Sequence, residues 1–102
     1  MPKLYEYFGI SFFFFAGEHL PVHVHGRYGE LETKAEIIAR EGKIVSINLR
    51  RVSNRRPLTG NARKHFIELV NVKAEDILKK WNDVFVLNKA VKPEVITRKI
   101  KF

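Results

Sequence analysis

The segment EHLPVHVHGRYG, residues 18–29, contains three of the four histidines of the chain. Pro21 favours an extended conformation in the residue before it, and the alternation that follows predicts a β-strand over residues 22–28. Successive side chains of a strand point to opposite faces, so His23 and His25 share one face and the two valines share the other. We expect the rest of the chain to be built around this histidine strand.

Three further segments have the composition of strands. Residues 7–15 are aromatic and β-favouring, residues 31–40 carry apolar side chains of one parity, and residues 43–49 follow the turn signal Glu41-Gly42. Short turns join all four segments, which favours an antiparallel meander. Both faces of residues 7–15 are apolar, so a second copy of the chain, a partner protein or long neighbouring side chains should cover the outer face.

The second half of the chain has helical periodicity. One apolar stripe runs through residues 62–70 and another through residues 74–85, with a break between them. We predict a single α+β domain over residues 1–88, a mainly antiparallel four-stranded sheet with two C-terminal helices packed on one face. Residues 89–102 form a basic C-terminal tail, for which a frayed terminus and an added edge strand are the alternatives.

Composition excludes several classes of protein. The 102 residues include no cysteine, so disulfides, thiolate zinc sites and cysteine nucleophiles are excluded. No apolar segment approaches the roughly 20 residues that a membrane-spanning helix needs, and no signal-peptide pattern is present. We therefore expect a cytoplasmic protein that does not bind membranes.

The net charge of +8 is distributed unevenly along the chain. Residues 40–64 hold eight Lys or Arg residues against one acid. RNA or DNA and an acidic partner protein would each complement these charges, and nucleic acid is slightly favoured. The alternative is that the charged residues only keep the surface solvated. Aromatic residues interleave poorly with these cations in the sequence, so base stacking is not encoded within the segment. The predicted binding residues are Arg50, Arg51, Arg55, Arg56, Arg63 and Lys64.

The histidine strand is a candidate metal site. His23 and His25 lie about 6.5–7 Å apart by strand rise, so both imidazoles can converge on one divalent ion such as zinc. His19 in the adjoining turn is the candidate third ligand, which would leave an open position for water. Glu18 or Glu30 would be a fourth ligand or would support the others by hydrogen bonds.

The same residues are candidates for catalysis without a metal. His23 and His25 can share the general base and general acid roles in RNA cleavage, since the unperturbed pKa of histidine lies near 6.5. Arg27 or an arginine of the basic segment would stabilise the charge of the transition state, and Tyr28 would stack on a base. The non-catalytic alternatives are histidines that stabilise the strand and turn, or that belong to a protein-binding face. His65 is interpreted as an ordinary surface residue of its helix.

Four motifs of this chain occur in the same order in a known family. They are FGI at residues 8–10, HLPVHVH at residues 19–25, YG at residues 28–29 and EDILKKW at residues 75–81. Over residues 2–86 the chain resembles the DUF4160 family of small prokaryotic proteins, which has a His-x-Pro-Pro-His-x-His signature, a meander and a helical pair. Val22 stands where the family usually has a second proline, and Lys73 where a histidine often sits.

The resemblance implies membership of a family without an established chemistry, whose members are associated through neighbouring genes with toxin–antitoxin-like modules. It implies a small cytoplasmic component of such a module, which binds a cognate partner protein and RNA or DNA. A homodimer is a further expected association. The alternative function is a His-dependent ribonuclease or a metal-dependent hydrolase centred on His19, His23 and His25.

Overall fold

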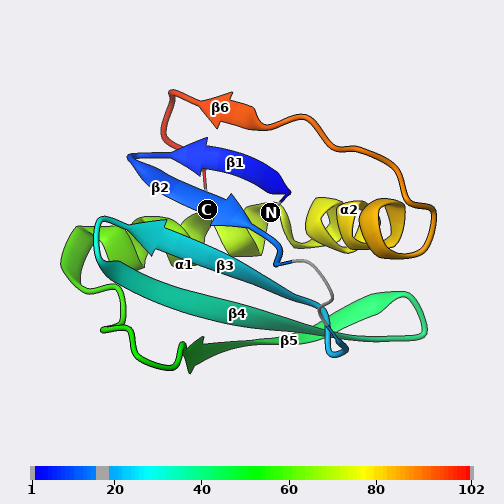
Figure 1. The fold of residues 1–102 in the computed structure, drawn as a ribbon. Helices are drawn as coiled ribbons and strands as arrows, with labels where there is room; N and C mark the ends of the chain where they lie inside the picture. Colours follow the sequence, from blue (N-terminus) through cyan, green and yellow to red (C-terminus); the bar gives the residue numbers. More distant parts are fainter. Residues whose placement is uncertain (1, 16–18, 102) are drawn as a thin grey trace.

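The computed structural model describes residues 2–15 and 19–101, and within these residues six strands form a single sheet (Figure 1). The strand order is β5-β4-β3-β2-β1-β6. Strands β1 to β5 pair antiparallel with their neighbours in the chain, whereas β6 pairs parallel with β1. The strands are β1 (Lys3–Tyr7), β2 (Ile10–Phe13), β3 (His23–Tyr28), β4 (Leu31–Arg40), β5 (Lys43–Arg51) and β6 (Glu94–Ile96).

The predicted four-stranded sheet is wrong, because the aromatic segment 7–15 is not one strand. The chain reverses at Phe8 and Gly9, whose φ angles are +48° and +77°. Positive φ at both central residues is the geometry of a two-residue hairpin turn, and it pairs Tyr7 with Ile10. The residues before the turn therefore form an extra strand, β1. The basic tail supplies the sixth strand, β6, at the far edge.

The helical part of the chain is almost continuous. Helix α1 (Gly60–Val72) and helix α2 (Ala74–Phe85) are separated by Lys73 alone. The N–H of Lys73 donates to the Leu69 carbonyl, and its own carbonyl accepts from the N–H of Ile77, so helical hydrogen bonding runs through the junction. The two helices predicted on either side of a break are therefore corrected to one helical segment with a single irregular residue. This segment lies behind the sheet in Figure 1.

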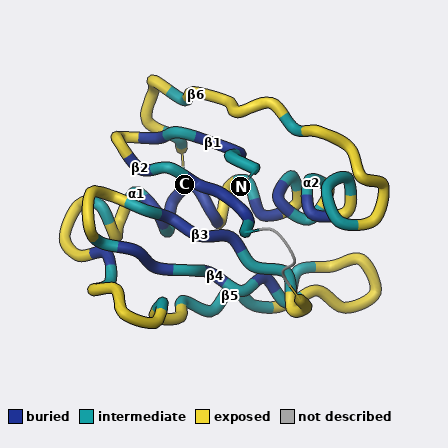
Figure 2. Tube along the Cα trace, in the orientation of Figure 1, coloured by how far each residue is buried: buried dark blue, intermediate teal, exposed yellow. Residues whose placement is uncertain are grey.

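The core lies between the sheet and the helices, where Figure 2 shows the buried parts of the central strands. The Phe66 ring of α1 stacks on Phe12 of β2, with centroids 5.4 Å apart. Trp81 of α2 packs edge-on against Phe14, with centroids 5.2 Å apart. Gly26 of β3 faces Phe66 so closely that an added Cβ would lie 2.3 Å from a ring carbon. This close approach places α1 directly over β3.

A polar cluster joins α2 to β1. The hydroxyl of Tyr5 donates to the Asp76 carboxylate, which also accepts a hydrogen bond from Lys80. Burial tends to raise the pKa of Asp76, but the hydrogen bonds from Lys80 and Tyr5 outweigh it and hold that pKa below its ordinary value. Burial, together with the Asp76 carboxylate, raises the pKa of Tyr5 far above its usual range. The phenol therefore stays protonated and remains a donor.

We predict that Gly26→Ala destabilises the protein by about 1–3 kcal/mol, because the new methyl group overpacks against Phe66. Urea unfolding followed by the fluorescence of the single tryptophan measures the loss. The double variant Gly26→Ala/Phe66→Leu should lose less than the sum of the two single losses, since the smaller side chain makes room. Strictly additive losses would contradict the contact.

Candidate functional site

The structure brings the candidate catalytic residues of β3 together. The ring centroids of His23 and His25 are 5.4 Å apart, and His23 also lies 5.5 Å from the Trp81 ring of α2. His25 and Arg27 lie on the sheet face opposite to Gly26, as the alternation of the strand predicts. The chemistry of this face depends on how the two side chains are held.

Glu32 of β4 is the centre of this site. Its side chain is 1% exposed, and its carboxylate accepts the Nδ1–H of His25 at 3.0 Å. Arg27 donates to the same carboxylate from Nε at 2.9 Å and contacts it from Nη2 at 2.8 Å, while Arg55 lies 3.8 Å away. We call Glu32, His25 and Arg27 the Glu32 cluster. It compensates a buried carboxylate with one imidazole and one close guanidinium.

Sequence reasoning did not identify Glu32. The residue lies seven positions after His25, and only the hairpin register makes the two diagonal neighbours, with Arg27 directly opposite Glu32. The signal was present in the turn Gly29-Glu30, because a two-residue loop fixes which residues of the flanking strands face each other.

Aromatic side chains enclose the imidazole of His25. Phe13 stacks on it with centroids 5.4 Å apart, and Phe15 meets it edge-on at 4.5 Å. The guanidinium of Arg27 lies 5.1 Å above the Phe13 ring. Neighbouring side chains therefore cover Phe13 on the outer face of the sheet, which is one of the three coverings expected. As a result His25 is only 5% exposed.

The candidate metal ligands are arranged less favourably. Nδ1 of His23 donates to the Pro21 carbonyl at 2.9 Å, and Nδ1 of His25 is held by Glu32, so Nε2 is the nitrogen of each ring that would face a metal. His19 is exposed in the preceding turn, and Glu18 lies outside the described residues. Within residues 2–15 and 19–101, no three His, Asp or Glu side chains gather closely enough to hold an ion.

The loop after β5 is fixed to the start of β4. The N–H of Glu32 donates to the Arg56 carbonyl at 2.9 Å, next to a parallel bridge between Leu31 and Arg56. Two residues further on, the N–H of Leu58 donates to the Thr33 hydroxyl at 2.9 Å, and the Leu58 side chain is buried. The arginines of this loop are thus presented on an anchored backbone.

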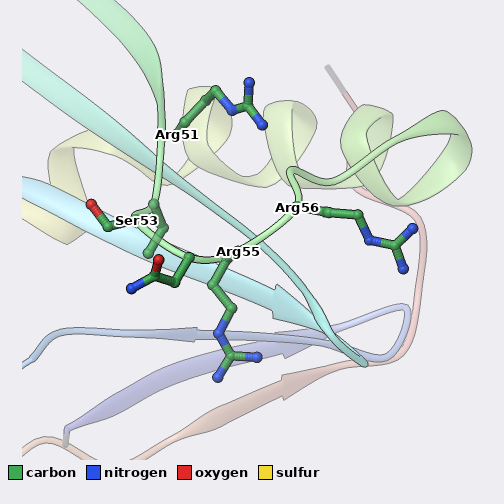
Figure 3. Close-up of a pocket in the computed structure, with 6 residues that line it drawn as sticks. Arg51, Ser53, Arg55 and Arg56 are labelled. Atoms are coloured by element: carbon green, nitrogen blue, oxygen red, sulfur yellow. The ribbon is translucent and has the colours of Figure 1, made fainter.

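Three of the predicted cationic residues, Arg51, Arg55 and Arg56, line a shallow hollow of about 440 Å3, shown in Figure 3. Its lining consists of residues 51–56 and contains no acid. Figure 3 shows Arg51, Arg55 and Arg56 projecting from the chain in different directions, so they form an open surface and not a closed clamp. We call the six predicted binding residues the arginine surface: Arg50, Arg51, Arg55, Arg56, Arg63 and Lys64.

Some members of the arginine surface are already engaged. Arg50 donates to Glu36 at 3.0 Å on the exposed side of the sheet, and Arg55 lies near the Glu32 carboxylate. Of the residues that the structure describes, none forms an ion pair with the other four cations, which are Arg51, Arg56, Arg63 and Lys64. Four charges are therefore available to an anionic ligand.

The fold and the site define a small α+β protein in which a buried Glu–His–Arg cluster lies beside a basic loop. A family model described as "Domain of unknown function (DUF4160)" matches residues 9–82. The chain therefore belongs to the DUF4160 family, as its motifs predicted. No curated protein and no solved structure matches it. Among the described residues, no helix is long and apolar enough to cross a membrane.

We predict that Glu32→Gln destabilises the protein by about 2 kcal/mol, because the buried site loses the charge-assisted hydrogen bonds that Arg27 and His25 donate to the carboxylate. The matched control is Glu36→Gln on the same strand, whose exposed pair with Arg50 should contribute less than about 1 kcal/mol. Chemical denaturation of both variants gives the comparison. Equal losses in the two variants would show that the Glu32 cluster does not stabilise the fold.

Proposed function

We propose that the chain binds single-stranded nucleic acid through the arginine surface, as one component of a toxin–antitoxin-like pair. The proposal rests on two observations. Four cations of this surface form no ion pair with any described residue, namely Arg51, Arg56, Arg63 and Lys64. Two of them, Arg51 and Arg56, line a hollow whose lining contains no acid. A flexible single strand can follow cations that point in different directions, whereas a duplex presents its phosphates in a rigid array.

The anchored loop supports this proposal. If the loop were disordered, a ligand would have to order it on binding, and the entropic cost of this ordering would reduce the affinity. Here the Arg56 carbonyl accepts the N–H of Glu32, and the N–H of Leu58 donates to the Thr33 hydroxyl, so the residues on both sides of Pro57 are tied to β4. The arginine side chains alone must therefore become ordered when a ligand binds.

The salt dependence of binding follows from the number of available cations. Each phosphate neutralised on a single strand contributes about −0.7 to the log–log slope of affinity against salt concentration. Four cations predict a slope of about −3, whereas all six residues of the arginine surface would give a slope of about −4. The slope therefore reports whether Arg50 and Arg55 stay bound to their carboxylates.

We predict that the triple variant Arg51→Ser/Arg56→Ser/Arg63→Ser binds a labelled single-stranded RNA 12-mer about tenfold or more weakly than the wild type at low salt. Fluorescence anisotropy at several salt concentrations measures the affinity. The slope should become less steep by about 2, changing from about −3 to about −1. The control is Lys89→Ser/Lys92→Ser/Arg98→Ser in the tail, which removes the same charge elsewhere. An equal loss in both variants, or salt-insensitive binding by the wild type, would contradict the proposal.

The partner-protein part of the proposal rests on the family resemblance and on β5. In the described part of the chain β5 pairs only with β4, so its outer edge presents unpaired backbone groups over Lys43–Arg51. Such an edge can accept a strand from another protein. We propose that this association occurs in the cytoplasm, with the partner on the β5 edge before Arg50 and nucleic acid on the arginine surface, which begins at Arg50.

A second candidate function is His-dependent cleavage of RNA, or hydrolysis with a metal, at His23 and His25. The Glu32 cluster favours it, because Glu32 fixes the proton of His25 on Nδ1 and Arg27 adds positive charge next to the imidazole. The burial of His25 opposes it, since a phosphate must reach the imidazole in order to exchange a proton. Binding is therefore the better-supported function.

We predict that the wild type leaves labelled RNA intact both with zinc and with a chelator, to the same extent as His23→Ala/His25→Ala. Gel electrophoresis of the incubated RNA provides the measurement, and circular dichroism shows that the variant is folded. The single variant His23→Ala is the control if loss of the buried His25 unfolds the chain. Cleavage by the wild type that both variants lack would establish the catalytic alternative.

A further inference from the structure

A second hollow, of about 400 Å3, lies at the end of the sheet where the β1–β2 turn, the end of β3 and the start of α1 meet, at the left of Figure 1. Its volume is within the range of small-ligand sites. We call it the aromatic pocket. It is lined by the aromatic rings of Phe8, Tyr28 and His65, with Leu31, Thr59 and Asn61 beside them.

The rings of the aromatic pocket are held in place while remaining accessible. Phe8 stacks on His65 with centroids 4.1 Å apart and an interplanar angle of 12°, and His65 is fixed by a hydrogen bond between Nδ1 and Glu68 of 2.9 Å. Tyr28 lies against Gly9, where an added Cβ would be 3.1 Å from its ring. Even so, Phe8 is 49% exposed and Tyr28 is 47% exposed. His65 is thus part of an aromatic cluster and not an ordinary surface residue.

The conformation of Phe8 is a separate indication of a binding role. Its φ of +48° lies in the left-handed region, which is unfavourable for a bulky residue and which Asn, Asp or Gly usually occupy in such a turn. The residue is also about half exposed, so it gains little from burial in the core. Strained backbone occurs preferentially at functional sites, and an exposed ring held in this way is a surface on which a flat ligand can stack.

The aromatic pocket adjoins the arginine surface. Leu31 lines the pocket, and its backbone forms the parallel bridge with Arg56. Thr59 and Asn61 belong to the same loop and helix start as Arg56 and Arg63. A planar group in the pocket would therefore have cations next to it, which is the combination that single-stranded nucleic acid requires.

We propose that the aromatic pocket binds a nucleobase of a single strand whose phosphates contact the arginine surface, an inference that rests on the proposed function. The base stacks on Phe8 and Tyr28, which would give affinity with little dependence on sequence. The side chain of Thr59 makes no capping hydrogen bond to α1, so its hydroxyl can bond to the edge of the base, as can the amide of Asn61.

Phe8→Asn tests the inference, because asparagine suits the left-handed turn and removes only the ring. With a single-stranded RNA decamer that contains one 2-aminopurine, we expect an affinity roughly 5- to 100-fold below that of the wild type. The quenching of 2-aminopurine fluorescence on binding should also be lost. Affinity for inorganic polyphosphate and the salt slope should not change, since no phosphate contact is removed. Thermal unfolding should show a variant at least as stable as the wild type.

Leu87→Asn is the matched control, since it removes an equally exposed apolar side chain far along the chain and should leave all of these quantities unchanged. If Phe8→Asn bound the decamer and quenched 2-aminopurine as strongly as the wild type does, the inference would be overturned. The proposed function would still stand in that case, provided that the salt slope of the wild type is about −3. A wild type that binds neither the decamer nor polyphosphate at low salt would overturn both. A decrease in polyphosphate affinity equal to the decrease for the decamer would also overturn the stacking role.

Discussion

The buried carboxylate of Glu32 is the interaction on which the arrangement of this protein depends. A charge removed from water must be compensated by close partners, and here the partners come from two segments other than β4. His25 and Arg27 bind it from β3, and Arg55 approaches from the loop after β5, while the Glu32 backbone holds Arg56. The carboxylate thereby fixes the position of the histidine strand and of the basic loop at the same time.

This interaction also divides the charged residues by role. Arg27 and Arg55 interact with the buried Glu32 carboxylate, and Arg50 forms an ion pair with Glu36. These three side chains therefore contribute less to the binding of an anionic ligand. Of the remaining cations, Arg51 and Arg56 line the open hollow, and the backbone of Arg56 is bridged to Leu31 of the aromatic pocket. The histidine motif, which first suggests a metal or catalytic centre, is explained in large part by packing: His25 is enclosed by Phe13, Phe15 and Glu32. The residues proposed to bind nucleic acid lie outside the histidine motif.

Local patterns predicted what depends on near neighbours in the chain. Alternation placed His23 and His25 together, and the basic loop was found where the periodicity ends. The prediction of one strand over segment 7–15 was wrong for two reasons. β propensity is the same on both sides of a chain reversal, and the turn contains Phe8 at a position where Asn, Asp or Gly is usual. β6 was left open, since a three-residue strand is formed only because β1 offers it an edge.

By itself, the sequence determined the family, the α+β class, the histidine strand and the position of the basic segment, because motifs, period and charge are properties of neighbouring residues. Only the tertiary structure decided which groups meet. Glu32 reaches His25 through strand register, and Phe8 meets His65 across 57 positions of the chain because the β1–β2 turn and the start of α1 lie at the same end of the sheet. Contacts between distant segments are set by packing, which no local pattern encodes.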